Sequence, residues 1–87
     1  MQTESTGPNA TQLLEVTIEI LGIRKDLTEI LGLYGVQSVS ELKEKIDLQQ
    51  LKEHPAYEDF LSAKQLEMDL RETIENARGI LAAMEPS

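Results

Sequence analysis

Cysteine and tryptophan are absent from this chain of 87 residues, which has one histidine, one phenylalanine and two tyrosines. Without cysteine there is no disulfide and no Cys/His cluster for a structural zinc ion. A chain this short buries only roughly 60–65% of the surface that its unfolded form exposes. Because cross-links are excluded, we expect packing against a partner or a second copy to supply the missing burial.

Long apolar runs are also lacking. The longest uninterrupted apolar stretches span a few residues, far short of the roughly 20 residues of a membrane-spanning helix. Residues 1–12 contain no apolar run, which predicts no secretory signal. We therefore expect a cytoplasmic protein, and the missing cysteines are typical of that reducing compartment.

Positive charge is scarce, with 8 basic residues against 16 acidic ones and a formal net charge of −8. A field of this sign repels a phosphate backbone or an anionic lipid surface. We expect no nucleic-acid partner and no membrane partner, and a basic protein surface is the better match. The five glycines are scattered and form no phosphate-binding loop, so no small-molecule substrate is expected.

The first eight residues are polar and end at Gly7-Pro8, which predicts a disordered leader (residues 1–8) before a single helical domain (residues 9–87). Asn9 and Gln12 have the spacing of a capping box, so a helix is expected over about residues 10–33. Apolar residues recur along it at alternating spacings of three and four, which is typical of a heptad seam. The seam comprises Leu13, Val16, Ile20, Ile23, Leu27, Ile30 and Tyr34.

A second apolar stripe accompanies this seam in the first half of the same helix. It consists of Leu14, Ile18 and Leu21. Together the seam and the stripe occupy more of the helix circumference than one neighbouring helix can cover. Gly32 and Gly35 are expected to end the helix.

The second helix is predicted to be short. Ser38 and Glu41 form a capping box, and Val39, Leu42 and Ile46 give one narrow apolar face. Two further polar residues, Asp47 and Gln50, have the spacing to cap another turn. The stretch is expected to end at His54, because Pro55 disfavours helical geometry in the residue before it.

A third helix is expected to start at Pro55 and to run to about Met84. Its predicted seam is Ala56, Phe60, Ala63, Leu66, Leu70, Ile74, Ala77, Leu81 and Met84. Tyr57, Leu61 and Met68 form a side stripe near its start. Glu67 and Arg71 have the spacing of a favourable i,i+4 ion pair.

The predicted fold is all-α: an antiparallel hairpin of two long helices with a short connecting helix, as a three-helix or dimeric four-helix bundle. In such a hairpin the two side stripes lie at opposite ends, so the connecting helix can reach only one of them. We therefore predict that a protein partner or a second copy covers this surface, with a homodimeric four-helix core preferred. The predicted partner-binding residues are Leu14, Ile18, Leu21, Tyr57, Leu61 and Met68. The alternative is that these residues form an ordinary intrachain core closed by the connecting helix.

Catalytic, cofactor-binding and metal-binding residues are not predicted. His54, the only histidine, is four residues before Glu58, which leaves open whether the two ever bind a metal. A lone histidine nevertheless lacks the repeated ligand spacing of metal sites. Glu41 with Glu44 and Glu72 with Glu75 are carboxylate pairs typical of solvated helix faces.

The chain resembles two known kinds of helical protein in outline only. The segment from Leu27 to Lys43 has the outline of a helix-turn-helix, but its second helix is rich in acids and has no arginine for guanine contacts. Acyl carrier proteins are similarly short, acidic and helical, yet their Asp-Ser-Leu motif does not occur; the nearest strings surround Ser38 and Ser40.

The sequence therefore predicts a non-enzymatic helical protein–protein interaction module that self-associates. It would act as a small accessory subunit, adaptor or regulator. The alternatives are an acidic helical carrier and a nucleic-acid mimic that inhibits a basic protein.

Overall fold

A computed structural model describes residues 10–84 of the chain. They form three helices, α1 (Ala10–Leu33), α2 (Val39–Asp47) and α3 (Glu53–Met84). No strand occurs in this range, so the predicted all-α class is confirmed. The expected leader over residues 1–8 and the expected cap at Asn9 lie outside the described residues.

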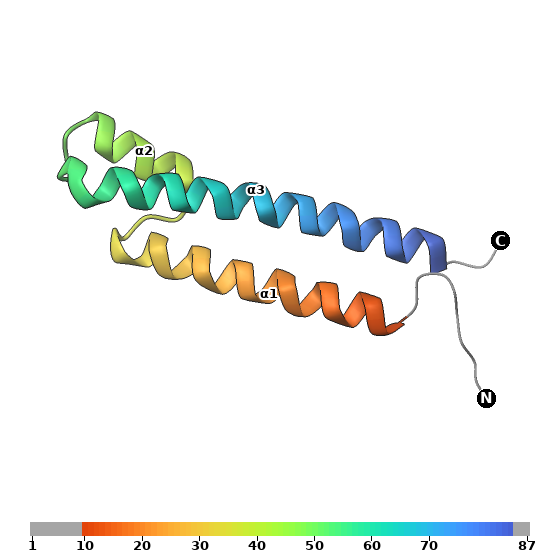
Figure 1. Ribbon diagram of the computed structural model, residues 1–87. Coiled ribbons are helices and arrows are strands. Elements are labelled where there is room, and N and C mark those ends of the chain that lie inside the picture. The colour runs from red at the N-terminus through yellow and green to blue at the C-terminus, as the bar shows by residue number, and fades with distance from the viewer. Residues whose placement is uncertain (1–9, 85–87) are drawn as a thin grey trace.

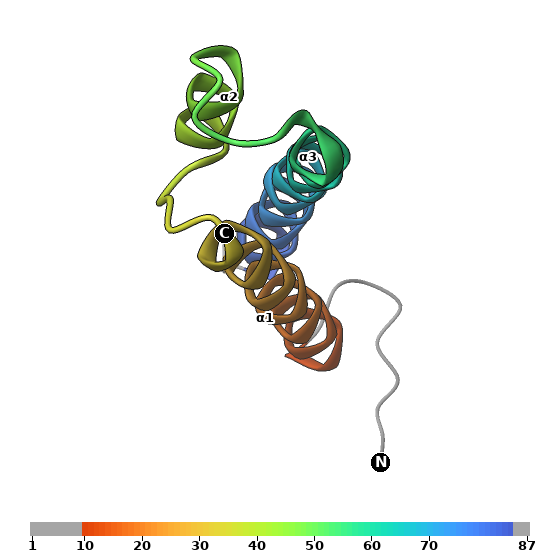
Figure 2. The same ribbon diagram turned by 90° about the vertical axis from the view of Figure 1, so that its left-hand side faces the viewer.

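The two long helices run side by side in opposite directions, and α2 packs on the first part of α3 (Figure 1). Figure 2 looks along the pair from the end where α1 stops and shows α2 set to one side of it. The molecule is elongated, with principal extents of 60 × 22 × 16 Å. Beyond α2 the rod is only two helices thick.

A Schellman motif ends α1, as the two glycines near Leu33 predict. Gly35 adopts a φ of +64°, which a glycine accepts without the steric cost of a Cβ atom. Its N–H donates to the Gly32 carbonyl at 3.3 Å, and the Val36 N–H donates to the Leu31 carbonyl at 3.2 Å. Leu31 and Val36 are both buried, which is the apolar contact that accompanies this motif.

The N-terminus of α2 is capped by Ser38, as predicted. The Ser38 Oγ accepts a hydrogen bond from the Glu41 N–H at 3.0 Å. The Glu41 carboxylate accepts from the Gln37 N–H at 2.9 Å, one residue earlier than the usual capping box.

The C-terminus of α2 is closed by a second Schellman motif, in which Gln49 takes the left-handed position with a φ of 61°. The Gln50 N–H donates to the Lys45 carbonyl at 2.9 Å, and the Gln49 N–H donates to the Ile46 carbonyl at 3.0 Å. The expected further turn capped by Asp47 is wrong, because the backbone reverses here instead of continuing as a helix.

Helix α3 includes an extended residue at its start. His54 has φ −104° and ψ 128°, the geometry that Pro55 imposes on the residue before it. Regular helical geometry therefore begins at Pro55, as expected, although the bounds of α3 include Glu53.

The core lies at the α2 end, where all three helices and the first loop meet. It consists of Leu31, Val36, Val39, Leu42, Phe60 and Ala63. Among the described residues, Leu42 is the one large side chain that is fully buried. The seam residues of α1 are only half-buried. Leu27, Ile30 and Tyr34 pack against the core, and the seam before Leu27 lies beside α3 alone.

The predicted α3 seam is wrong at its C-terminal end. Leu81 and Met84 are exposed, while Thr73 is buried and Ile80 is half-buried. Leu66, Thr73 and Ile80 are seven residues apart and all at least half-buried, so the contact with α1 keeps heptad spacing. The predicted seam leaves that spacing, because it steps from Leu70 to Ile74 and then to Leu81. Thr73 tolerates burial because its hydroxyl donates to the Asp69 carbonyl at 2.8 Å.

A side-chain hydrogen bond joins the end of α1 to the start of α3. The Tyr34 hydroxyl donates to Asp59, and this bond raises the pKa of Tyr34 to about 12, with partial burial and the charges of Asp59 and Glu58 contributing further. The neutral phenol is thus the form that the fold stabilises.

Replacing Tyr34 by phenylalanine is expected to lower the free energy of unfolding by about 1–2 kcal/mol at neutral pH, because Asp59 loses its donor. A raised folded-state pKa gives stability that is present below the unfolded pKa of 10.0 and lost as the pH rises through about 12. Urea unfolding followed by circular dichroism, from neutral pH upward, should show a smaller alkaline loss in Tyr34→Phe than in the unchanged chain. Tyr57→Phe, at an exposed tyrosine, is the matched control, and equal alkaline losses in all three proteins would contradict the role of Tyr34.

Gln49→Gly is expected to raise the free energy of unfolding by about 0.5–1 kcal/mol. A left-handed conformation costs a non-glycine residue roughly 1–2 kcal/mol, and the extra freedom of glycine in the unfolded chain offsets part of the gain. Gln50→Gly is the matched control, because Gln50 is not among the residues with positive φ. Equal effects of the two substitutions in urea unfolding would contradict strain at Gln49.

Candidate functional site

His54 and Glu58 lie in contact at the start of α3, as their spacing suggests. The His54 Nδ1 is 2.7 Å from the Glu58 Oε2, and both side chains are exposed. Within residues 10–84, no group of three or more histidine, aspartate or glutamate side chains is placed to hold a metal ion. The pair therefore lacks the further ligands that a metal site requires.

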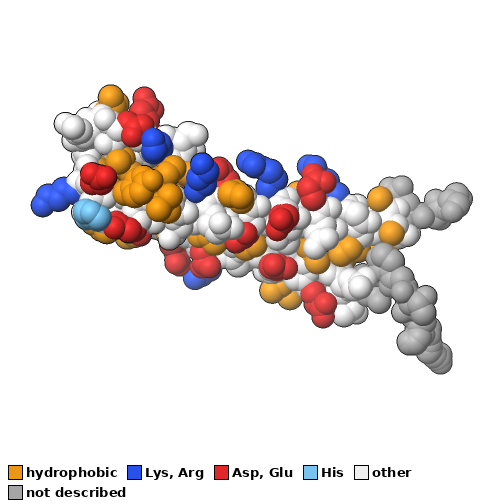
Figure 3. Space-filling model, turned by 45° about the horizontal axis from the view of Figure 1, so that its top comes forward, with side chains coloured by type: hydrophobic (Ala, Val, Ile, Leu, Met, Phe, Trp, Pro, Cys, Tyr) orange, Lys and Arg blue, Asp and Glu red, His pale blue; other side chains and the backbone are white. Residues whose placement is uncertain are grey.

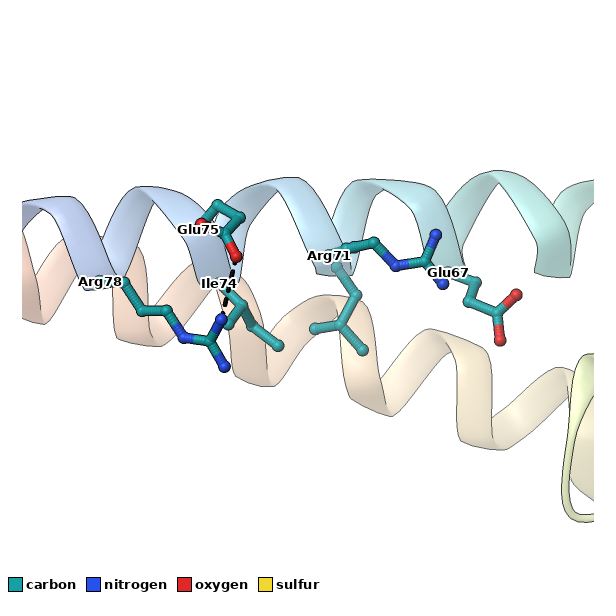
Figure 4. Close-up of a pocket in the computed structure, with 6 residues that line it drawn as sticks. Glu67, Arg71, Ile74, Glu75 and Arg78 are labelled. Carbon is teal, nitrogen blue, oxygen red and sulfur yellow. Dashed lines mark hydrogen bonds and ion pairs between the residues drawn. The ribbon is translucent and has the colours of Figure 1, made fainter.

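The other polar residues considered from the sequence serve local contacts. Ser38 and Glu41 cap α2, and Glu75 pairs with Arg78 at 2.9 Å. The predicted Glu67–Arg71 ion pair is wrong: both residues line a hollow on α3 (Figure 4), but no ion pair joins them among the described residues.

Exposed apolar side chains are the most prominent surface feature of the described residues. Ten large hydrophobic side chains are exposed, whereas seven hydrophobic residues are buried and two of those are alanines. Figure 3 shows a large hydrophobic group at the α2 end and smaller groups along the rod. Exposed large hydrophobic side chains therefore outnumber the fully buried ones among the described residues.

The α1 outer stripe, defined as Leu14, Ile18 and Leu21, is 58–60% exposed. At 100° per residue, its centre lies about 150° around α1 from the centre of the seam that faces α3. The stripe therefore points away from the rest of the molecule. The prediction that it accompanies the seam on the same side of the helix is wrong.

The α3 outer stripe, defined as Tyr57, Leu61 and Met68, is 39–51% exposed. The Tyr57 ring contacts the Phe60 ring, with centroids 5.9 Å apart, and the stripe otherwise lies on the side of α3 away from α1. Helix α2 thus covers neither outer stripe. The two stripes lie on opposite sides and at opposite ends of the rod, and in the α3 outer stripe two helical turns separate Leu61 from Met68. Their role in partner binding stays a prediction.

Leu33 is a surface residue that the sequence did not single out. It is 74% exposed and lines a hollow of about 720 Å³ between α1 and α3. The residues lining this hollow are Asp26, Glu29, Ile30, Gly32, Leu33 and Leu66. In the sequence, Leu33 stands out only as an apolar residue outside both the seam and the stripe. The hollow could not be predicted, because it forms where α1 and α3 meet.

Two glycines inside the long helices have open surroundings. A Cβ atom on Gly22 or Gly79 would meet nothing within 4 Å. A close approach of two helices within this chain therefore does not account for either glycine.

Several lysine and arginine side chains lie on the face that carries α2. Figure 3 shows them there, mixed with acidic side chains. The hollows on this face are lined by Lys43, Lys64, Arg71 and Arg78, with Glu67 shared between them. The hollow at Leu33 instead has Asp26 and Glu29 as its charged residues.

None of the helices in residues 10–84 is both long and apolar enough to cross a membrane. Comparison with curated proteins and with solved structures gives no match. The model of the Uncharacterized protein MJ0235 family matches residues 12–82, which include both outer stripes and the core, and the chain belongs to this family.

Proposed function

We propose that this protein is a non-enzymatic helical interaction module, a small accessory subunit, adaptor or regulator that binds other proteins through its apolar outer helix faces. The observation that carries the proposal is the excess of exposed over buried large hydrophobic side chains among the described residues. Contiguous exposed apolar surface on a small protein is typical of a protein-binding site.

The first partner we propose is a second copy of the chain, bound at the α1 outer stripe. If two α1 helices pack antiparallel, Ile18 lies near the two-fold axis and Leu14 of one copy lies opposite Leu21 of the other. The neighbouring Gly22 has no Cβ atom and has open space around it, so the two backbones can approach closely.

The direction of the stripe decides the form of this dimer. Because Leu14, Ile18 and Leu21 point away from α3, pairing through them places the two α1 helices at the centre and one α3 helix on each outer side. The proposed assembly is therefore a four-helix layer rather than a closed four-helix bundle.

The expected affinity is modest. Burying a fully exposed leucine or isoleucine is worth roughly 1.5–3 kcal/mol, so six side chains that are each about 60% exposed supply roughly 5–11 kcal/mol. Association costs roughly 4–15 kcal/mol, and the net charge of −8 on each copy opposes it. We expect a dissociation constant in the micromolar range or weaker, and tighter association at higher salt.

Leu14→Glu or Leu21→Glu is expected to abolish the dimer while changing the free energy of unfolding of the monomer by less than about 0.5 kcal/mol, because both side chains are exposed. Light scattering after size-exclusion chromatography measures the mass, and urea unfolding of diluted protein measures the stability. A clean monomer for the unchanged chain at millimolar concentration would contradict self-association.

Three further variants distinguish the loss of apolar contact in the dimer from charge repulsion and from loss of the folded core. Leu14→Gln adds no charge, so loss of the dimer in this variant identifies lost apolar contact rather than repulsion. Leu48→Glu alters an equally exposed leucine outside both stripes and should leave the dimer intact. Leu42→Ala alters the fully buried core and should cost about 2–5 kcal/mol of stability.

A further inference from the structure

The hollow at Leu33 combines an apolar lining with an acidic wall. Ile30, Leu33 and Leu66 supply the large apolar side chains, and Asp26 and Glu29 supply the charged ones. Leu33 is the most exposed large hydrophobic side chain of the described residues. A bulky apolar group from another molecule would find contacts from both α1 and α3 here.

A second hollow, of about 370 Å³, continues along the same side of the helix pair. It is lined by Glu19, Glu72, Thr73 and Asn76. Glu19 precedes Asp26 by seven residues and Thr73 follows Leu66 by seven, and residues seven apart lie on the same side of a helix. The two hollows together form what we call the acidic groove, which spans about 21 Å from Glu19 to Leu33 at 1.5 Å per residue.

The charges of the acidic groove have one sign. Its charged lining residues are Glu19, Asp26, Glu29 and Glu72, and no lysine or arginine lines either hollow. Of these four carboxylates, only Glu29 forms an ion pair among the described residues, at 2.9 Å from the exposed Lys25. The three lysine and arginine residues of α3 line the hollows on the α2 side instead, and Figure 4 shows Arg71 and Arg78 there.

We infer that the acidic groove binds a basic amphipathic helix of a partner protein. A helix of about four turns matches the 21 Å length. Its apolar face seats on Ile30, Leu33 and Leu66, and its lysines or arginines face Glu19, Asp26 and Glu72. Helices of this kind bind through apolar anchors spaced along one face, while complementary charge speeds association and selects the partner.

A second copy of the chain fits this groove less well. The face with the most lysine and arginine also carries Glu67 and Glu75, and its Arg78 is already paired with Glu75. The net charge of −8 further disfavours a copy against an acidic wall. The inference rests on the proposed role in protein binding but not on self-association, because the α1 outer stripe lies about 100° around α1 from Asp26 and Leu33.

The test uses the full chain, labelled with ¹⁵N, and a designed peptide of about 18 residues. The peptide carries leucines on one helical face and lysines or arginines elsewhere. One comparison peptide replaces every basic residue by glutamate, and another has the same composition in an order that destroys the apolar face. Titration followed by amide chemical shifts gives both the affinity and the location of binding.

The expected result is saturable binding of the basic peptide, with the largest shifts at residues 26–33 and around Leu66, and no comparable binding of either comparison peptide. Asp26→Asn combined with Glu19→Gln should weaken binding roughly 2–10-fold. The affinity of this double variant should also change less with salt concentration. Leu33→Ser should weaken it roughly tenfold. The matched controls are Glu44→Gln and Leu48→Ser, which change an exposed acid and an exposed leucine away from the groove and should leave binding unchanged.

Shifts centred on either outer stripe, equal affinity for the glutamate peptide, or no binding at millimolar concentration would overturn the inference. Concentration-dependent shifts of the groove residues in Leu14→Gln, without peptide, would assign the groove to a second copy and would also overturn it. Leu14→Gln separates the two proposals, because it should abolish the dimer but leave peptide binding unchanged.

Discussion

Leu42 has no exposed surface, and the side chains packed around it hold the three helices together at one end of the molecule. Helix α2 has 9 residues and α3 has 32, so α2 covers about 13 Å of a helix about 48 Å long. Beyond that point each long helix has one neighbour, which hides one face and leaves the other in water. The exposed α1 outer stripe follows from this difference in helix length. The α3 outer stripe starts at the α2 end and is exposed because α2 packs on another side of α3.

Local hydrogen bonds matter more in such a molecule than in one with a large core. The Schellman motif at Gly35 brings Leu31 onto Val36, and the Ser38 cap fixes where α2 begins. These contacts set the bounds of α2, and the burial of Val39 and Leu42 against Phe60 and Ala63 holds it on α3. The bond from Tyr34 to Asp59 then ties α1 to α3 across the core end. The rest of the rod is left with exposed apolar side chains, for which we propose a protein partner, and the charges of the acidic groove favour a basic one.

Much of the helical framework could be predicted from local sequence signals. The three-and-four spacing predicted α1 over residues 10–33, the Ser38–Glu41 box marked the start of α2, and Pro55 marked the extended residue before it. These signals act within a few residues, so they need no knowledge of the fold.

The remaining features depend on how helices meet. Thr73 and Ile80 are covered rather than Leu81, because the way α3 meets α1 decides which of two adjacent residues faces the contact. The left-handed conformation of Gln49 could not be predicted, because no glycine stands at that position. The Tyr34–Asp59 bond joins residues 25 apart in the sequence, so it too depends on the fold. The groove at Leu33 exists only when α1 and α3 are side by side. The position of the α1 outer stripe was available from the 100° rotation per residue, which places Leu14 away from the seam.

Amide hydrogen exchange of α1 at two protein concentrations tests most directly whether another molecule covers the two-helix part of the rod. Amides near Leu14, Ile18 and Leu21 should exchange more slowly in concentrated solution than in dilute solution, while amides near Leu42 keep the same protection. Identical exchange of α1 at both concentrations would mean that the outer face of α1 stays in water, and self-association through it would be contradicted.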